Sequence, residues 1–249
     1  MQPAALLLPL MLAAAPAPDA ACVAHSTRER PHLVELYTSE GCSSCPPAER
    51  WMSSIRDDAT QVGLEFHVDY WDELGWPDPF ADARYTARQR TLAERDTRAI
   101  VYTPQIVVDG RVWKNWPATA APAASPAIAS PALSLRVSRT DAIHATLDGE
   151  AVSAAPYRMF VALTENGLNS TVNAGENKGK RLAHDQVVRA FAGPLKFPQA
   201  ETTLDPPPGL DAAKSSVVAF IEDERSGDVV QVVRLSLAQC PTAQTSEQP

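Results

Sequence analysis

Hydrophobic and polar positions in the first half of the chain alternate between strand spacing and helix spacing. Apolar runs at residues 32–37 and 64–70 are typical of buried strands, and a β-branched run follows at 106–108. Between the first two runs, the apolar side chains of residues 46–61 recur on one helical face: Ala48, Trp51, Met52, Ile55 and Ala59. Residues 82–98 are predicted to form a second helix. Strands that alternate with helices predict an α/β unit.

The pattern changes after residue 116, where the α/β unit (31–116) is predicted to end. Residues 117–132 are rich in Ala and Pro, which favours a semi-extended linker over a stable helix. Residues 133–240 contain short apolar runs separated by turn signals, which predict a smaller all-β, sandwich-like domain. The candidate strands of this domain are 133–137, 143–147, 158–164, 187–191, 216–221 and 229–237. Residues 241–249 are predicted to be a disordered tail.

The first 21 residues are rich in Ala and Leu and contain an apolar core at residues 4–15. This core is too short for a membrane-spanning helix and is typical of a signal peptide, and small residues that suit cleavage follow it. The segment departs from the usual pattern because no Lys or Arg precedes the core. We therefore predict a signal peptide over residues 1–21, a periplasmic or secreted protein, and no stable membrane span.

Export changes what the cysteines can do, because thiols outside the cytosol can pair and stay paired. Cys22 and Cys240 lie near the two ends of the chain and could form a disulfide that ties the N-terminal arm to the end of the all-β domain. The alternative is lipidation of Cys22, which the preceding Ala20 and Ala21 suit and Asp19 opposes. Spacing alone does not fix the connectivity.

Composition limits the class of partner. The chain has 249 residues and a formal net charge of -8. This surplus of acidic groups argues against a general nucleic-acid binder, because such proteins need a basic surface to meet phosphates. The sequence contains no phosphate-binding loop and no internal repeat, and we expect no cofactor.

Cys42 and Cys45 carry the strongest chemical signal. They form a CxxC between the first strand and the first helix, where the pair Pro46-Pro47 fits only the first helical turn. Unpaired N–H groups and the helix dipole at such a position stabilise a thiolate. Cys42 is the predicted nucleophile of a thiol–disulfide redox centre, and Cys45 is the predicted resolving thiol. Two interpretations compete: half of a structural zinc site, which needs further ligands, and a purely structural disulfide.

Thr103 and Pro104 precede a predicted β-hairpin, in which the run at 106–108 leads into an Asp-Gly turn and a return strand. A Thr-Pro bond at the start of a strand is compatible with a cis peptide. Because this segment lies downstream of a CxxC, Pro104 is assigned to the redox centre and Thr103 to substrate binding.

The order strand, CxxC helix, strand, helix and Thr-Pro hairpin resembles the thioredoxin superfamily. Several segments resemble, more narrowly, a family of secreted bacterial thioredoxin-like proteins described as a domain of unknown function: residues 34–49, 66–76, 78–80, 102–105, 175–180 and 187–189. The resemblance extends over roughly residues 31–240 and implies a thioredoxin-like fold and a location outside the cytosol. The chain departs from a thioredoxin at 117–132, where Pro-rich sequence replaces the usual closing helix.

The resemblance also implies a catalytic role for Glu35, on the strand that leads to the CxxC. Thioredoxins carry an acidic residue on the corresponding strand, where it helps to move protons during exchange. In this sequence the spacing from Glu35 to Cys42 is one residue longer than in that pattern. The alternative for Glu35 is an exposed carboxylate at the sheet edge.

Two further groups of polar side chains have open interpretations. His67 and Asp69 are predicted to share one strand face, where a proton-shuttle or metal role competes with an ordinary polar contact. On the second helix, one stripe of arginines fits either an anion site or a solvated face paired with carboxylates: Arg84, Arg88, Arg95 and Arg98.

Aromatic side chains follow the strand at 64–70. In a thioredoxin-like fold, the ends of the strands and the CxxC lie near the same edge of the sheet. Tyr70, Trp71 and Trp76 could therefore line a groove for an unfolded peptide substrate, or they could pack in the core.

The leading functional hypothesis is a thiol–disulfide oxidoreductase that acts on a protein or small-molecule thiol or disulfide. A second is a Cu(I) chaperone with Cys42, Cys45 and His67 as ligands, because soft thiolates suit that ion. A third is a non-enzymatic binding protein, in which the all-β domain recruits a partner and the CxxC has no active role.

Overall fold

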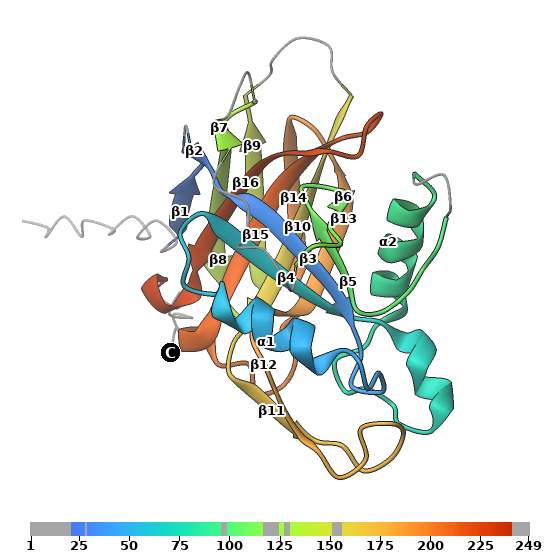
Figure 1. Ribbon diagram of the computed structural model, residues 1–249. Helices are drawn as coiled ribbons and strands as arrows, with labels where there is room; N and C mark the ends of the chain where they lie inside the picture. Colours follow the sequence, from blue (N-terminus) through green and yellow to red (C-terminus); the bar gives the residue numbers. More distant parts are fainter. Residues whose placement is uncertain are drawn as a thin grey trace, which may run out of the picture.

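The computed structural model describes most of the chain between residues 21 and 240 (Figure 1). The described ranges are 21–27, 29–95, 99–116, 125–126, 130–150 and 156–240. The predicted signal peptide apart from residue 21, most of the predicted linker, and the predicted tail lie outside these ranges. Within them, none of the helices has the length and apolar character needed to cross a membrane.

Eight strands form one continuous sheet in the order β16-β15-β10-β13-β4-β3-β5-β6 (Figure 1). Their bounds are β3 His32–Thr38, β4 Gln61–His67, β5 Gln105–Val108, β6 Arg111–Val112, β10 Tyr157–Glu165, β13 Val187–Lys196, β15 Ser215–Asp223 and β16 Val229–Ser236. β3 and β4 run parallel, and β13 joins β4 in parallel where Val187 lies opposite Glu65. Strands predicted for two domains, 31–116 and 133–240, therefore share one sheet, and the predicted boundary does not divide it.

The junction between β4 and β13 depends on Gln186 and Gly63. The main-chain oxygen of Gln186 accepts from Glu65 N at 2.9 Å, and its side-chain oxygen accepts from Gly63 N at 2.9 Å. Its amide nitrogen donates to Met52 O at 2.9 Å. A Cβ at Gly63 would lie 2.4 Å from the Gln186 side-chain oxygen, so only glycine leaves room for this amide. The two predicted domains merge because the open edge of β4 finds its hydrogen-bond partners here.

A second sheet packs against one face of the eight-stranded sheet. Its strands, in the order β1-β8-β9-β14, are β1 Cys22–His25, β8 Leu133–Arg139, β9 Ile143–Gly149 and β14 Gln199–Leu204. Alternate residues of β8, at Leu133, Leu135 and Val137, join the buried cluster formed with β10, β15 and β16. The six strands predicted between 133 and 240 are all confirmed.

Several short strands were not predicted. β11 (Leu168–Thr171) pairs with β12 (Arg181–His184), and β2 (Glu29–Arg30) pairs with β7 (Ser125–Pro126). These strands, like β14, contain few apolar residues, so hydrophobic periodicity gives them no signal.

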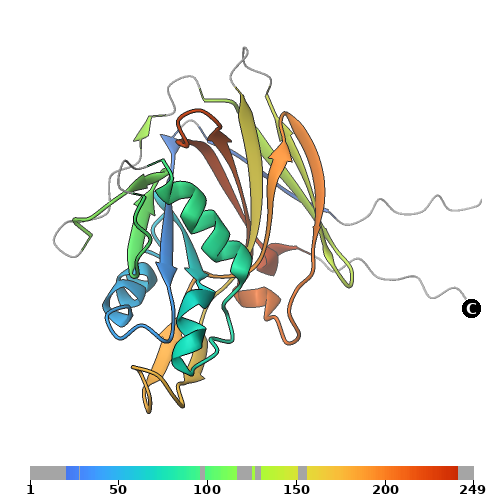
Figure 2. The same cartoon turned by 90° about the vertical axis from the view of Figure 1, so that its right-hand side faces the viewer.

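Helices cover both faces of the central strands (Figure 2). α1 (Pro46–Ser54) packs on Val34 and Leu36 of β3, and α2 (Ala83–Ala93) lies on the other face, near Leu33 and Tyr37. Successive side chains of a strand point to opposite faces, which divides β3 between the two helices. Three 3-10 helices complete the described structure: η1 Asp69–Leu74, η2 Ala212–Lys214 and η3 Leu237–Gln239.

Both helices are shorter than the sequence predicts. α1 ends at Ser54 instead of residue 61, because the chain turns at Asp58, whose carboxylate accepts from Thr60 N at 2.8 Å, and then enters β4. α2 ends at Ala93, and residues 96–98 of the predicted helix lie outside the described ranges.

A disulfide joins Cys22 to Cys240 over a sequence separation of 218 residues. It ties β1 to the segment that follows β16 and confirms the pairing considered from the sequence. The alternative of a lipidated Cys22 is not what the structure contains, because that sulfur is already bonded.

Replacing Cys22 and Cys240 by Ala is expected to lower the free energy of unfolding by about 5 kcal/mol, because a cross-link over so long a loop restricts the unfolded chain. Urea unfolding under non-reducing conditions measures this loss. The control is the double Ala variant at Cys42 and Cys45. Their disulfide spans a sequence separation of 3 residues and so restricts the unfolded chain far less. Equal losses for the two variants would contradict the prediction.

Candidate functional site

The Cys42–Cys45 disulfide lies where β3 leads into α1. Cys45 is the N-cap of the helix, and Pro46 is its first residue, which confirms the predicted helix start. Both cysteines are fully buried, whereas Ser43 and Ser44 between them are exposed. The pair is therefore oxidised in this structure. The disulfide is buried, and the two residues between its cysteines are exposed to solvent.

Trp71 connects the CxxC with the Thr103-Pro104 segment. Its indole Nε1 donates to Thr103 Oγ1 at 2.8 Å, and a Cβ at Gly41 would lie 3.1 Å from Trp71 Cβ. The peptide bond between Thr103 and Pro104 is cis, as the sequence allowed. Because the residues that precede Cys42 and Pro104 contact the same side chain, the structure brings the predicted redox pair and the predicted proline to one place.

The other predicted groove side chains are tied into hydrogen bonds. Trp76 Nε1 donates to Glu40 Oε2 at 2.7 Å, and Tyr70 OH donates to Gln89 Oε1 at 3.3 Å. Tyr70, Trp71 and Trp76 are all half-buried. Each ring is packed with its polar end paired, which fits the packing interpretation better than an open groove.

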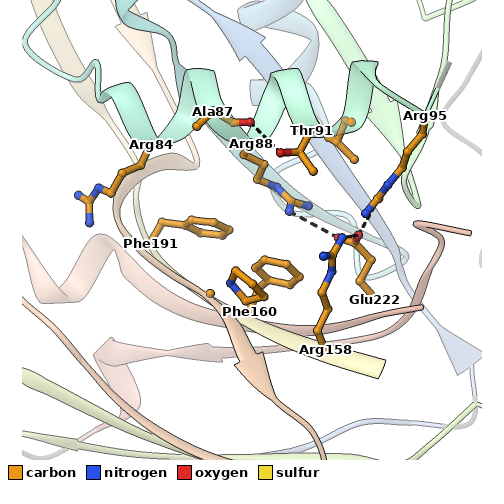
Figure 3. A pocket seen from close by; sticks show the side chains of 12 residues that line it. Arg84, Ala87, Arg88, Thr91, Arg95, Arg158, Phe160, Phe191 and Glu222 are labelled. Carbon is orange, nitrogen blue, oxygen red and sulfur yellow. Dashed lines mark hydrogen bonds and ion pairs between the residues drawn. The ribbon is translucent and has the colours of Figure 1, made fainter. Parts of the chain in front are cut away.

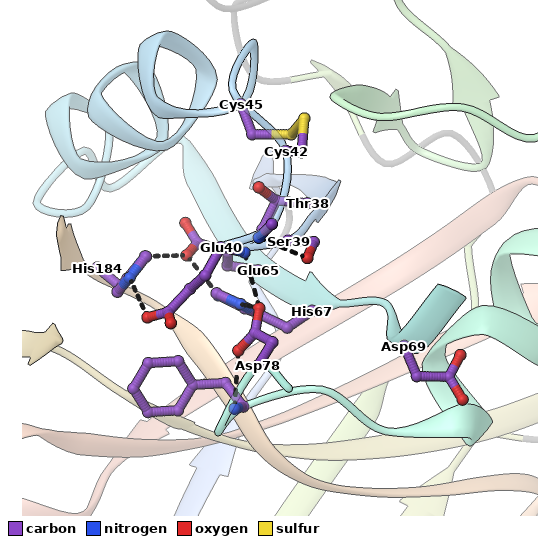
Figure 4. A network of polar contacts seen from close by, with 12 residues as sticks. Thr38, Ser39, Glu40, Cys42, Cys45, Glu65, His67, Asp69, Asp78 and His184 are labelled. Atoms are coloured by element: carbon purple, nitrogen blue, oxygen red, sulfur yellow. Dashed lines mark hydrogen bonds and ion pairs between the residues drawn. A yellow bond between two sulfur atoms is a disulfide. The ribbon is translucent and has the colours of Figure 1, made fainter. Parts of the chain in front are cut away.

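A network of buried polar side chains lies beneath the disulfide (Figure 4). We call it the buried polar network, and its members are Thr38, Glu40, Glu49, Glu65, His67, Asp78 and His184. They come from β3, α1, β4, β12 and the loops that follow β3 and η1. Four carboxylates and two imidazoles thus share a volume from which water is largely excluded.

His184 contacts three of these carboxylates. Its Nε2 lies 3.2 Å from Glu40 Oε1, and its Nδ1 lies 3.3 Å from Glu65 Oε1 and 3.7 Å from Glu49 Oε2. Burial alone would lower its pKa, but hydrogen bonds with Glu40 and Glu65 raise the pKa of His184 to about 9. The imidazole is therefore positively charged at neutral pH.

His67 is held between Glu65 and Asp78. Its Nε2 lies 3.0 Å from Glu65 Oε1, and its Nδ1 lies 2.7 Å from Asp78 Oδ2. Burial opposes the charged form, but the two carboxylates raise the pKa of His67 well above its ordinary value. Burial would raise the pKa of Asp78, yet the charge of His67 holds it below the usual value. These three groups form an internal ion-pair chain.

Glu49 is the member of the network that titrates near neutral pH. It follows Cys45 by one turn of α1, and its Oε1 accepts from Thr38 Oγ1 at 2.6 Å. Burial and the negative charge of Glu65 raise the pKa of Glu49 to about 7. A carboxyl group with such a pKa, one turn from a disulfide, can give or take a proton at neutral pH.

Three members of the network could hold a metal ion. One ligand atom each of Glu65, His67 and His184 lies within 4.8 Å of the others, and this is the three-ligand group found among the described residues. Such ligands suit Zn²⁺, but both ring nitrogens of His67 already face carboxylates. Neither Cys42 nor Cys45 belongs to the group, so the structure does not assemble the Cu(I) ligand set considered from the sequence.

Residues of the second half complete the site. Asn177 Nδ2 donates to Cys42 O at 2.9 Å and to Glu40 O at 2.8 Å. Glu176 Oε2 accepts from Ser43 N at 3.0 Å. The loop between β11 and β12 is therefore fastened to the backbone of the CxxC, and the site cannot form from the α/β unit alone.

Glu35 lies on the other face of the sheet from this network. It is fully buried, and its carboxylate accepts from Arg88 Nε at 2.7 Å, Arg88 Nη2 at 2.8 Å and Tyr37 OH at 2.8 Å. Leu36 packs beneath α1, so strand alternation turns Glu35 toward α2. The exposed-edge alternative for Glu35 is wrong, and the structure does not bring this carboxylate to the disulfide.

Most of the network was missed from the sequence. Glu65 and His67 do alternate along β4, which was a usable signal for one polar face. Asp69 does not share that face as predicted, because β4 ends at His67 and Asp69 begins η1, where it accepts from Thr86. His184 had no local signal, since it reaches the site through tertiary contacts alone.

The free energy of unfolding is expected to fall by about 3 kcal/mol between pH 6.5 and about pH 9.5 through His184. A pKa raised in the folded state means that this stabilisation is complete below the ordinary value of 6.5 and is lost as the pH rises through about 9. Urea unfolding across this range measures the loss. His144→Gln, at an exposed histidine of β9, should keep it, and His184→Gln should reduce it. A flat wild-type profile would contradict the assignment.

Comparison with known proteins places the chain in a family. Among curated proteins, none matches the sequence. The crystal structure of protein AGR_C_4864 from Agrobacterium tumefaciens is similar to this one. The two sequences are 20% identical, the match covers 88% of this chain and 96% of the other, and the TM-score is 0.53. HBP35 of Porphyromonas gingivalis is 14% identical over 90% of this chain and 80% of its own, with a TM-score of 0.62. At these identities the likeness is one of fold. A family model described as "Protein of unknown function (DUF1223)" matches residues 33–222, and the chain belongs to that family.

Proposed function

We propose that the protein is an exported, thioredoxin-like protein that exchanges disulfides through Cys42 and Cys45. The observation that carries the proposal is the disulfide at the N-terminus of α1, above a buried group that titrates near neutral pH. The apolar segment at the start of the sequence and the paired Cys22 and Cys240 support a location where disulfides persist.

The arrangement of the first half supports a thioredoxin-like unit. In chain order it runs β3, α1, β4, α2, β5 and β6, and the strands lie in the order β4-β3-β5-β6. The CxxC follows β3 and the Thr103-Pro104 bond precedes β5, which is the sequence of elements expected for that fold. The larger sheet and the second sheet are additions to this unit.

The exchange step follows from the oxidised pair. A substrate thiolate attacks Cys42 Sγ, a bond forms between these two sulfurs, and the Cys42–Cys45 bond breaks to leave Cys45 as a thiolate that takes up a proton. A second substrate thiolate then attacks the substrate sulfur of the mixed disulfide and releases the Cys42 thiolate. The substrate dithiol has become a disulfide, and its two electrons remain on the two protein thiols. The reduced protein runs the same steps in reverse.

Glu49 supplies the proton for the Cys45 thiolate in this proposal. It lies one turn along α1 from Cys45, and near neutral pH it is populated in both its protonated and ionised forms. The charged His184 keeps the ionised form of Glu49 tolerable inside the protein, since it lowers the pKa that burial and Glu65 raise. Glu49 therefore takes the role that the family resemblance would have given to Glu35.

Access to the sulfurs is the step that the loop between β11 and β12 controls. Both cysteines are fully buried, and Asn177 holds the backbone at Cys42 while Glu176 holds Ser43. Exchange therefore requires this loop or the Ser43-Ser44 turn to move. The copper hypothesis has no comparable support, because His67 lies between two carboxylates and not beside the cysteines.

The reduction potential of the Cys42–Cys45 pair is expected to lie between about −270 and −120 mV, the range of known exchange proteins. It is measured by equilibration with glutathione buffers in a variant with Cys22 and Cys240 replaced by Ala, so that a single disulfide is observed. A potential below about −300 mV would mark the pair as structural and would overturn the proposed function.

Asn177→Ala is expected to increase the rate of reduction of the Cys42–Cys45 disulfide by dithiothreitol about tenfold, because it removes two hydrogen bonds to the buried backbone of the site. The matched control is Asn169→Ala, at an exposed asparagine of β11 whose side-chain amide donates to Gly167 O at 3.2 Å, within its own turn. Stopped-flow fluorescence or quenched alkylation gives the rates. If both variants react at the wild-type rate, the loop does not control access.

A further inference from the structure

A cavity of about 390 Å³ lies on the α2 face of the sheet (Figure 3). It is bounded by α2, β10, β13 and β15. Its wall carries four arginines and two phenylalanines: Arg84, Arg88, Arg95, Arg158, Phe160 and Phe191. Three of the arginines belong to the stripe noted in the sequence, so that stripe faces a cavity and not bulk solvent alone.

Three of these arginines converge on one carboxylate, that of Glu222 (Figure 3). Arg95 Nη1 and Arg158 Nη2 lie 2.6 Å and 2.7 Å from Glu222 Oε1, and Arg88 Nη1 lies 3.5 Å from Oε2. Arg88 has its closer partner in Glu35, on β3. Glu222 is the acidic residue that lines the cavity.

The cavity wall has more positive than negative charge. Among the described residues, Glu222, Glu35 and Asp82 are the carboxylates that pair with its four arginines, so one positive charge is in excess among these groups. Arg158 Nε is buried and has no hydrogen-bond partner among the described residues. A buried guanidinium N–H without an acceptor is costly. The Arg158 side chain is 20% exposed, so a small turn of its guanidinium would let an anion in the cavity accept from this N–H.

The rest of the wall is apolar. The ring of Phe160 is covered, because it stacks on Phe191 with centroids 5.7 Å apart and on Phe220 with centroids 5.0 Å apart, and the Arg88 guanidinium lies 4.8 Å from its centre. Phe191 is half-buried, so its ring is the one that a ligand can reach. Leu92 and Pro194 extend this surface. The volume lies in the range of small-molecule sites, and stacked rings favour a planar partner.

We propose that this cavity binds a small aromatic carboxylate, with its carboxylate on Arg158 and its ring against Phe191 and Pro194. One excess positive charge fits a monoanion, and a planar guanidinium fork suits a carboxylate. The apolar wall fits the ring, and Arg84, at the exposed rim, adds attraction for an anion as it approaches. The site is independent of the disulfide, from which the sheet separates it.

The test is isothermal titration calorimetry of the full oxidised protein with 2-naphthoate and with its neutral counterpart 2-naphthamide. The acid should bind at least tenfold more tightly than the amide, because only the acid supplies an acceptor for the unpaired N–H and balances the excess charge. Failure of the acid to bind, or equal binding of the two compounds, would overturn the proposal. This comparison uses the wild-type chain and so does not depend on whether a variant folds.

Arg158→Gln should weaken 2-naphthoate binding about tenfold and leave the exchange activity at Cys42 and Cys45 unchanged. The matched control is Arg136→Gln, at an exposed arginine of β8 in the second sheet, which should bind as the wild type does. Thermal unfolding of both variants checks that the fold is kept. Equal affinity of the folded Arg158→Gln variant and the wild type would contradict the assignment of the carboxylate.

Discussion

Buried charge that must be paired is the constraint on which the rest of this structure depends. The central strands carry a carboxylate toward each face, Glu35 on β3 and Glu65 on β4, and both are fully buried. An unpaired buried ion costs several kcal/mol, so each needs a cation close by. The cations come from distant segments: Arg88 from α2 and His184 from β12. Glu35 is paired within the first half, but Glu65 draws on His184 of the second half, so the first half alone does not supply all the partners of its buried charges.

The two faces solve the same problem with different chemistry. On the α1 face the partners are imidazoles, and His184 loses its charge as the pH rises through about 9, while the pKa of Glu49 lies at about 7. On the α2 face the partners are guanidinium groups, which keep their charge at every biological pH. There, although burial acts to raise it, nearby arginines hold the pKa of Glu222 below its usual range. The group that titrates near neutral pH thus lies on the side that carries the disulfide, and the opposite side carries charge that does not change with pH.

Local patterns in the sequence predicted the strands and helices with strong apolar periodicity and the helix start at the CxxC. They did not predict the buried polar network beneath the disulfide. Its members are single polar residues on elements that the chain brings together only after folding, such as His184 on β12 and Asn177 in a loop. The error at Glu35 has the same origin, because the resemblance gave the strand but not which face the side chain would take. The merging of two predicted domains into one sheet was also hidden, since a single residue pair, Val187 and Glu65, marks the junction.

The amide of Gln186 gives that junction a property of its own. The side chain of Gln186 binds β4 at Gly63 and α1 at Met52. The main-chain oxygen of the same residue accepts from Glu65 N of β4, so one residue of the second half holds two elements of the first. Position 63 has no room for a side chain beside this amide, and a residue at 186 without an amide loses the bonds to Gly63 and Met52. The two positions therefore depend on each other: a side chain at 63 would displace the amide, and without the amide position 63 no longer requires glycine. Anyone transplanting the CxxC half of this protein onto another scaffold would have to carry both.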